Sequence, residues 1–358
     1  MAVAFHRLTV ADVRRETPEA VSVAFAVPPH LAAEYRFHPG QHLTLRTSFD
    51  GAECRRSYSV CAGLDDGELR VAVKKVEGGA FSTWINEALK PGYVVDVMTP
   101  QGRFGLPPDA SSPHIYLAIA AGSGITPVMS LARTLLAREP HAEFLLLYGN
   151  RNSQSILFKD AIEDLKDRYL DRFTVHHVLS REQQELPLLN GRIDAGKVEA
   201  LLGALAPVDE IDHVFLCGPG ALIEESRAAL IRLGVPADRI HVEYFSADGA
   251  PVPVRAQVIP AAEVVSVATA QITLAGAVHM LPMQAGETII DAGLRHGLDM
   301  PYSCRGGMCC TCRAMLVEGE VAMDLNYSLE PWELAAGYVL TCQAHPKTAR
   351  VVVDYDQI

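Results

Sequence analysis

The sequence predicts a multidomain protein with three folded parts: an antiparallel β-barrel, an α/β domain with a doubly wound parallel sheet, and an α+β domain of the β-grasp type. Three observations support this fold class. The first third of the chain consists of short strand-like segments, the middle alternates strand-like with helical segments, and the last quarter contains a group of cysteines. At 358 residues the chain is also too long for one ordinary hydrophobic core.

Residues 1–108 are expected to form the barrel, because proline–glycine turns separate segments that alternate in polarity or are continuously apolar. A short helix is expected at residues 81–89. The expected strands are residues 21–27, 42–46, 57–60, 69–76 and 94–98.

Residues 109–245 are expected to form the α/β domain, because apolar runs alternate with helical patterns, which favours a parallel sheet covered on both faces. The expected strands are residues 116–121, 144–148, 173–179, 214–217 and 240–244, and the expected helices are residues 127–137, 158–168, 195–202 and 221–233.

Residues 246–266 contain three prolines and are expected to be a linker to the last domain, residues 267–358. In that domain we expect strands at 267–274, 279–284 and 350–355 and a helix at 288–295. It has 10 acidic and 5 basic side chains. The excess suits docking onto a basic surface, and an ordinary solvated surface explains it equally well.

Composition and charge restrict the possible partners and location. The formal charge of −12 makes nucleic acid an unfavourable partner. No apolar run approaches the ~18 residues of a membrane span, and the N-terminal residues contain no signal-peptide core. We therefore expect a cytoplasmic protein without a membrane segment.

The most specific motif is Cys304-x4-Cys309-x2-Cys312, which Cys342 follows thirty residues later. This is the plant-type spacing of a [2Fe–2S] cluster, in which one loop supplies three thiolates and a distant segment supplies the fourth. Cys310 does not fit the spacing and is expected to be dispensable. The motif predicts a carrier of single electrons.

Three other interpretations of the cysteines fit less well. A thioredoxin-like dithiol would use only Cys309 and Cys312. A structural zinc ribbon favours two separated C-x2-C pairs, and disulfides are not expected in a chain without a signal peptide. The remaining thiols are read as small buried side chains; these are Cys54, Cys61 and Cys217.

Two barrel motifs indicate a flavin nucleotide. Residues 56–59 read R-S-Y-S on an expected strand, where alternation places Arg56 and Tyr58 on one face. A guanidinium can bind a pyrophosphate and an aromatic ring can stack on a flavin. Residues 78–82 read G-G-A-F-S and offer N–H groups at a helix start to a phosphate. Taken alone, these motifs also fit an ordinary strand and an ordinary helix cap.

Two turns in the α/β domain indicate a dinucleotide. Residues 122–127 read G-S-G-I-T-P after the first expected strand, a strand–turn–helix context typical of dinucleotide binding, although the usual third glycine is absent. The fourth expected strand ends in C-G-P-G at residues 217–220. Ligands of open α/β sheets bind along the carboxyl edge of the strands, so both turns belong to one expected site.

These motifs occur in the order found in the ferredoxin–NADP reductase superfamily, and the whole chain resembles members that are fused to a plant-type ferredoxin domain. Several stretches are similar to the reductase subunits of bacterial phenylacetyl-CoA 1,2-epoxidases; they are FHPGQHLTL, AIAAGSGITPVMS, NGRID, NYSLEPWELAAGYVLTCQA and RGGMCCTC.

The resemblance implies roles in binding FAD and in hydride transfer. Arg56 would hold the FAD pyrophosphate, Tyr58 would pack on the isoalloxazine, and Ser59 would lie near flavin N5, while Gly79 and Ser82 would meet the phosphates. The nicotinamide nucleotide would be bound by Gly122, Gly124, Thr126 and Pro127 at its pyrophosphate and by Cys217, Gly218 and Pro219 near its nicotinamide, with Phe245 over the other flavin face. The expected catalytic residues are Tyr58, Ser59 and Cys217.

The expected donor is NADPH. A site for NAD usually has an acidic residue at the end of the second strand. This chain has Arg151 there, and Ser180 and Arg181 follow the third strand, which resembles the grip of the superfamily on a 2′-phosphate. Ordinary surface arginines are the alternative.

The expected function is an NAD(P)H-dependent oxidoreductase that passes electrons through FAD and the [2Fe–2S] cluster to a separate protein. The one Glu-x-x-His sequence, Glu210 to His213, runs into an expected strand, so no di-iron site is expected in this chain. The resemblance implies the multisubunit di-iron oxygenase of phenylacetate catabolism as the partner. The alternatives are a reductase of a Rieske or steroid-hydroxylating oxygenase and a non-enzymatic metal-binding or iron-sensing module.

Overall fold

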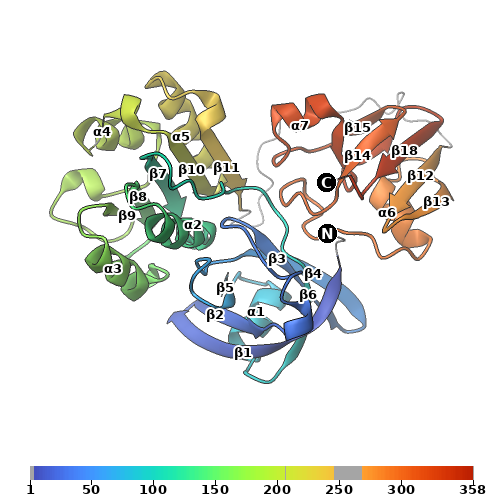
Figure 1. Cartoon of the computed structure of the whole chain (residues 1–358), viewed down its shortest axis with the longest axis horizontal. Helices are drawn as coiled ribbons and strands as arrows, with labels where there is room; N and C mark the ends of the chain where they lie inside the picture. Colours follow the sequence, from blue (N-terminus) through green and yellow to red (C-terminus); the bar gives the residue numbers. More distant parts are fainter. Residues whose placement is uncertain (1–3, 206, 246–267, 358) are drawn as a thin grey trace. The chain divides into compact units, whose positions relative to one another are not determined.

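The computed structural model describes residues 4–205, 207–245 and 268–357, so the linker expected at 246–266 lies outside the described residues. The chain divides into two compact units (Figure 1). Among the described residues, one contains 6–54 and 58–245, and the other contains 268–357 together with residues 4–5 and 55–57. The larger unit holds the barrel and the α/β domain. Among the described residues, no helix has the length and apolar character needed to cross a membrane.

The barrel is a six-stranded sheet with the order β4-β3-β6-β1-β2-β5. Its two ends meet where Val60, just after β4, bridges to Val71 of β5. The inward side chains form one hydrophobic cluster that includes residues of α1 (Ala80–Glu87). The strands are β1 (Phe5–Thr17), β2 (Ala20–Ala26), β3 (His42–Phe49), β4 (Ala52–Ser59), β5 (Leu69–Lys74) and β6 (Val94–Met98).

Strand β1 was not expected from the sequence. Only Leu8, Val10 and Thr17 of its 13 residues are buried, and its pairing with β2 shifts register after Val10 and again after Arg15. Because each shift interrupts the alternation of buried and exposed positions, the strand lacks a period-two apolar pattern.

The α/β domain has the expected five strands and four helices. Its sheet has the order β11-β10-β7-β8-β9, and every neighbouring pair is parallel. Strands β8 and β9 follow β7 on one side and β10 and β11 lie on its other side, so the strand order switches between β7 and β10. The strands are β7 (Ile115–Ala121), β8 (Glu143–Asn150), β9 (Phe173–Leu179), β10 (His213–Gly218) and β11 (Ile240–Tyr244), and the helices are α2 (Ile125–Arg138), α3 (Lys159–Arg168), α4 (Ala195–Leu205) and α5 (Gly220–Arg232).

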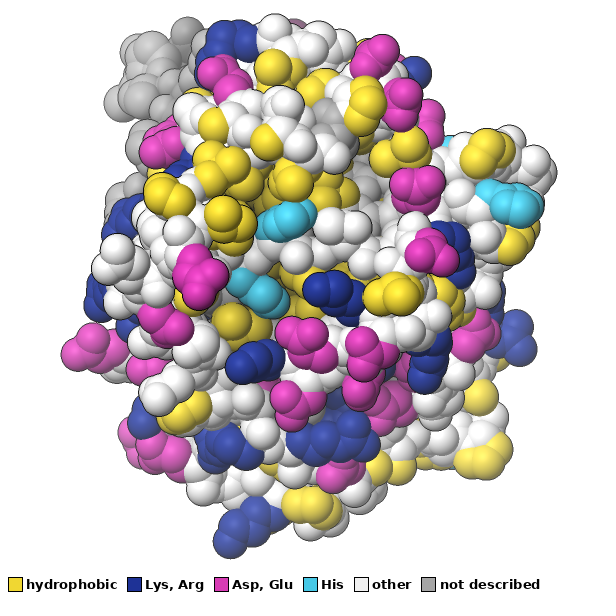
Figure 2. Space-filling model, turned by 90° about the vertical axis from the view of Figure 1, so that its left-hand side faces the viewer, with side chains coloured by type: hydrophobic (Ala, Val, Ile, Leu, Met, Phe, Trp, Pro, Cys, Tyr) yellow, Lys and Arg dark blue, Asp and Glu magenta, His cyan; other side chains and the backbone are white. Residues whose placement is uncertain are grey.

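Acidic and basic side chains are intermingled on the face of the molecule in Figure 2. Within the larger unit, side chains of opposite charge also connect the barrel to the α/β domain. These ion pairs are Arg133–Asp66 at 2.6 Å, Arg138–Asp65 at 2.8 Å and Arg151–Glu19 at 2.6 Å.

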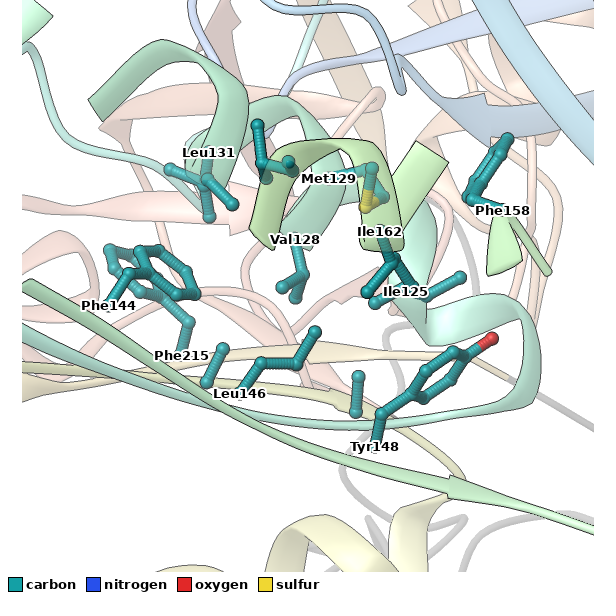
Figure 3. Packing of buried hydrophobic residues seen from close by; sticks show 14 of the residues in the cluster. Ile125, Val128, Met129, Leu131, Phe144, Leu146, Tyr148, Phe158, Ile162 and Phe215 are labelled. Carbon is teal, nitrogen blue, oxygen red and sulfur yellow. The ribbon is translucent and has the colours of Figure 1, made fainter. Parts of the chain in front are cut away.

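The core under α2 and α3 fixes the position of the turn after β7. Side chains of α2 lie over those of β8 and β10 (Figure 3). At the carboxyl end of β8, Tyr148 is fully buried, and its hydroxyl donates to the carbonyl oxygen of Gly122 at 2.9 Å. The packing of the sheet therefore holds the first residue of the G-x-G-x-x-P turn.

The smaller unit is a five-stranded mixed sheet with the order β13-β12-β18-β14-β16, beside a two-stranded sheet of β15 and β17. Helix α6 contributes Ile289 and Ile290 to its core. The elements are β12 (Thr269–Leu274), β13 (Ala277–Pro282), α6 (Ile289–Arg295), β14 (Arg313–Glu318), β15 (Val321–Met323), α7 (Pro331–Ala336), β16 (Tyr338–Leu340), β17 (Ala344–Pro346) and β18 (Arg350–Asp354). Of these, β14 to β17 and α7 were not expected.

Candidate functional site

Strand β4 presents the R-x-Y-S motif. Arg56 is exposed, and its Nη1 donates to the carbonyl oxygen of Arg55 at 2.7 Å. Tyr58 is half-buried against the barrel core, with its ring 6.1 Å from that of Phe81. Ser59 is buried. A half-buried aromatic ring two residues from an exposed guanidinium fits the flat ring and the charged diphosphate of a flavin nucleotide.

The loop before α1 begins the helix at Gly79, which is its N-cap. Ser82 is buried in the first turn of α1, and its hydroxyl reaches back to the loop, where it accepts from the N–H of Val76 at 3.0 Å and donates to the carbonyl of Gly79 at 3.1 Å. A Cβ on Gly79 would lie 2.8 Å from the Ser82 hydroxyl oxygen. Ser82 therefore holds the loop in shape, and the N–H groups at the start of α1 remain available to a phosphate.

The G-x-G-x-x-P turn packs directly against the end of β10. Gly122 has φ of +55°, and a Cβ on Gly124 would lie only 2.2 Å from the carbonyl oxygen of Cys217. No residue other than glycine fits at position 124 without moving the backbone. Thr126 is buried, and its hydroxyl donates to the carbonyl of Ser123 at 3.0 Å. Pro127 lies in the first turn of α2. The backbone N–H that proline lacks would have no acceptor within the helix at this position, so the helix loses no hydrogen bond.

Glu243 connects two of the expected catalytic residues. The hydroxyl of Ser59 donates to its Oε2 at 3.1 Å, and the thiol of Cys217 lies 3.9 Å from the same oxygen. Cys217 and Glu243 are paired neighbours on β10 and β11. One carboxylate therefore joins the end of the barrel motif to the end of the nucleotide-domain sheet.

Burial and the carboxylate of Glu243 raise the pKa of the Cys217 thiol well above its usual value. The thiol consequently stays protonated near neutral pH and acts as a neutral donor to Glu243. Phe245 lies two residues after Glu243; its N–H donates to the carbonyl of Gly218 at 2.9 Å, and its side chain packs against the core that contains Cys217. Pro219 caps α5 next to this contact.

The ends of two strands bring together the three residues of the expected 2′-phosphate site, Arg151, Ser180 and Arg181. The N–H of Arg181 donates to the carbonyl of Arg151 at 2.7 Å, and the N–H of Ser180 donates to the carbonyl of Asn150 at 2.9 Å. Arg151, Ser180 and Arg181 are all exposed. The residues thus form one polar edge at the carboxyl ends of β8 and β9.

The sequence did not identify two residues at this site. One is Glu243, and the other is Lys74 at the end of β5, whose Nζ lies 3.8 Å from the position of a Cβ on Gly122. An ammonium group beside this turn complements the charge of a pyrophosphate. Neither residue belongs to a short motif; the only signal for Glu243 was its place at the end of the last predicted strand of the α/β domain.

In the smaller unit, the four cysteines of the predicted cluster interact as two pairs. The thiols of Cys304 and Cys309 shift each other's pKa in opposite directions, and those of Cys312 and Cys342 do the same. Cys309, together with the N–H groups of Gly306 and Met308, lowers the pKa of the Cys304 thiol to about 7. Two pairs of thiols fit a [2Fe–2S] cluster, in which each iron takes two cysteine ligands.

Cys310 is oriented differently from these pairs. Its sulfur donates to the carbonyl of Ser328 at 3.3 Å, and its backbone is left-handed with φ of +52°. Ser328 in turn donates to the carbonyl of Gly307 at 3.0 Å. The Cys310 side chain thus connects Ser328 to the cysteine loop, and its exclusion from the cluster ligands stays a prediction.

Comparison with protein families matches all three parts of the chain. Residues 8–105 match the oxidoreductase FAD-binding domain, residues 118–228 match the oxidoreductase NAD-binding domain, and residues 272–347 match the 2Fe-2S iron-sulfur cluster binding domain. Together these matches cover more than half of the chain.

Individual relatives align over almost the whole chain. A component protein of the 1,2-phenylacetyl-CoA epoxidase of Escherichia coli K12 is 48% identical and covers 98% of both chains. The ferredoxin reductase component of the 3-ketosteroid-9-alpha-monooxygenase of Rhodococcus rhodochrous is 34% identical over 97% of this chain and 96% of that protein. Among solved structures, phthalate dioxygenase reductase has the same fold, with a TM-score of 0.59 at 24% identity over 98% of both chains.

The chain is therefore an NAD(P)H-dependent FAD and iron–sulfur oxidoreductase, and it belongs to the family of oxygenase reductases that includes this component of the E. coli 1,2-phenylacetyl-CoA epoxidase.

Proposed function

We propose that this protein passes electrons from NADPH through FAD and a [2Fe–2S] cluster to the multisubunit di-iron oxygenase component of a phenylacetyl-CoA epoxidase. The observation that supports this partner is the 48% identity to the E. coli epoxidase protein, which extends over all three parts of the chain. The 34% identity to a 3-ketosteroid monooxygenase reductase supports a second candidate, a steroid-hydroxylating oxygenase.

The FAD site would be formed by residues 1–108. The exposed guanidinium of Arg56 would bind the pyrophosphate, and Tyr58 would pack on the isoalloxazine. The N–H groups after Gly79 would bind phosphate oxygens, in a loop that Ser82 holds in shape. When bound, a flavin accepts a hydride from a nicotinamide and releases electrons one at a time, which a [2Fe–2S] cluster requires.

The nicotinamide nucleotide would lie along the carboxyl edge of the sheet in residues 109–245. The turn of Gly122, Gly124, Thr126 and Pro127 would bind the pyrophosphate, with the ammonium of Lys74 beside it. Arg151, Ser180 and Arg181 would bind the 2′-phosphate, which is the reason for proposing NADPH over NADH.

Ser59, Cys217 and Glu243 would position the two rings for hydride transfer. Because Ser59 lies on the barrel and Cys217 on β10, their shared contact with Glu243 fixes the distance between the halves of the site. Gly218, Pro219 and Phe245 would border the nicotinamide and the flavin. In this arrangement the side chains orient the two rings and exclude water from between them, and none needs to form a covalent bond.

The cluster would be held by Cys304, Cys309, Cys312 and Cys342 in residues 267–358, which would follow a linker at 246–266. The side-chain amide of Gln343 donates to the sulfur of Cys342 at 3.5 Å and to the carbonyl of Arg305 at 2.8 Å. Such donors to a sulfur stabilise negative charge on the cluster.

The deciding experiment combines the purified protein, NADPH, phenylacetyl-CoA and the purified di-iron oxygenase component, and measures the epoxide or its ring-opened product. We expect product formation that depends on all four. A parallel reaction replaces the oxygenase with a 3-ketosteroid hydroxylase and its substrate. Equal or faster turnover there, or no epoxide at any ionic strength, would refute the proposed partner.

A further inference from the structure

We propose that Glu19, in the turn between β1 and β2, is a specificity-determining residue that competes with the 2′-phosphate of NADPH for Arg151. The inference rests on the proposed function, in which Arg151 and Arg181 bind that phosphate. It adds an acidic residue of the barrel to a site that otherwise consists of α/β-domain residues.

The contact itself is direct. A carboxylate oxygen of Glu19 accepts from Nη2 of Arg151 at 2.6 Å. The Glu19 side chain is 55% exposed and the Arg151 side chain is 43% exposed. Because both groups stay hydrated, Arg151 can exchange one anionic partner for another without leaving a buried charge unpaired.

The backbone of the Glu19 turn is fixed independently of Arg151. The carbonyl of Glu19 accepts from the N–H of Lys75 at 2.7 Å, and the N–H of Glu19 donates to the hydroxyl of Thr17 at 3.2 Å. The carboxylate is therefore held near the ends of β8 and β9, and a change of its charge need not alter the turn.

Glu19 differs from Glu182, a second carboxylate near the expected 2′-phosphate site. Glu182 follows Arg181, but its Oε2 accepts from the N–H of Ser153 at 2.8 Å and from the Ser153 hydroxyl at 2.9 Å. These two bonds tie Glu182 to the loop after β8. Glu19 is bonded to the guanidinium that a 2′-phosphate would use.

The two nucleotides should respond differently to this pair. A phosphate monoester carries a charge of about −1.5 to −2 at pH 7, so NADPH must replace Glu19 at Arg151 and then remain close to its negative charge. NADH has only a 2′-hydroxyl there and can leave the pair intact. Glu19 thus weakens the binding of NADPH selectively and reduces the discrimination against NADH.

The test uses the full chain and measures reduction of ferricyanide by each nucleotide. We expect Glu19→Gln to lower KM for NADPH about two- to fivefold, which corresponds to about 0.4–1 kcal/mol, the range of an exposed ion pair. KM for NADH should not change. The competitive inhibition constants should change in the same way: Glu19→Gln should tighten the binding of 2′,5′-ADP, which carries the 2′-phosphate, and leave the binding of 5′-AMP unchanged.

Glu199→Gln is the matched control. It removes the same charge and breaks an exposed ion pair to Arg232 at 2.7 Å that connects α4 and α5, so it should change neither KM. In an Arg151→Ala background, the effect of Glu19→Gln should be much smaller, because the guanidinium for which Glu19 and the 2′-phosphate compete is gone.

Three results would overturn the inference: no change in KM or inhibition with Glu19→Gln, an equal change for both nucleotides, or an undiminished effect in the Arg151→Ala background. The Arg151→Ala variant alone separates this from the proposed function. If it impairs NADPH and NADH equally, the 2′-phosphate role itself is wrong. If it impairs only NADPH while Glu19→Gln has no effect, only the role of Glu19 is wrong.

Discussion

At the residue scale, the carboxylate of Glu243 contacts both parts of the proposed nucleotide site, so its role in positioning them can be tested by substitution. It accepts from Ser59 of the barrel and lies beside Cys217 of the α/β domain. Glu243→Ala would leave the buried Ser59 hydroxyl without this partner and loosen the spacing of the two rings. We expect NADPH to reduce the flavin at least about tenfold more slowly, since small losses of alignment are costly, with FAD content unchanged.

Stopped-flow measurement of flavin absorbance checks this, and Glu243→Gln, which can still accept from Ser59, should recover part of the rate. Full wild-type speed in Glu243→Ala with normal FAD content would show that the carboxylate does not position the reactants.

A second prediction at this scale separates neighbouring cysteines. Cys309→Ser should abolish the visible and EPR signals of the cluster, because it removes one member of a thiol pair, while FAD and NADPH-dependent ferricyanide reduction persist. Cys310→Ser should retain the cluster, since a hydroxyl can still donate to the carbonyl of Ser328. The opposite pattern would reassign the ligand.

Several of the residues that the sequence proposed at these sites lie within short motifs, where fixed spacing carries the information. Ser59 and Cys217 were proposed in this way. Glu243 is 184 residues from Ser59 and 26 from Cys217, and Lys74 is on the barrel although it lies beside a turn of the α/β domain. Their roles depend on how the chain folds back on itself, so no local pattern could reveal them.

At the scale of elements, the G-x-G-x-x-P turn packs tightly against β10. Gly124→Ala would place a Cβ 2.2 Å from the carbonyl of Cys217 and force the turn and the strand apart. We expect a loss of stability of about 1–3 kcal/mol and a KM for NADPH raised about tenfold or more, with flavin retained.

Gly203→Ala is the matched control, because Gly203 lies in α4 and a Cβ there would meet no atom within 4 Å. It should leave KM unchanged and raise stability by up to ~1 kcal/mol through helix propensity. Thermal unfolding and nucleotide kinetics on both variants decide the matter; indistinguishable variants would mean that the turn tolerates the displacement.

The elements that the sequence predicted well are those with long, regular patterns. The three central strands of the parallel sheet, β7, β8 and β10, are largely buried on both faces and appear as apolar runs. In the smaller unit, β15, β16 and β17 have three residues each, which is too short to show a period. The cysteine spacing identified that domain where secondary-structure patterns could not.

At the scale of the whole molecule, each compact unit has its own hydrophobic core. The cluster in the smaller unit consists of residues from Ala268 to Tyr355, and the clusters of the larger unit consist of residues from Leu8 to Phe245. The order of the three parts was predictable because each contains its own motifs. Within the larger unit, the ion pairs between the barrel and the α/β domain lie outside these motifs or join residues far apart in the sequence.

This division predicts that the chain ending at residue 245 should fold, bind FAD and reduce ferricyanide with NADPH at a rate within about twofold of the full protein. The reason is that the core residues of the barrel and of the α/β domain, together with Ser59, Cys217 and Glu243, all precede the cut. The shortened chain should lack the cluster spectrum and give no product with the oxygenase component, because single electrons then have no iron–sulfur carrier.

Activity of the shortened chain with the oxygenase at the full rate would mean that electrons leave from the flavin directly. Loss of FAD from a folded short chain would mean instead that the last domain helps to form the flavin site.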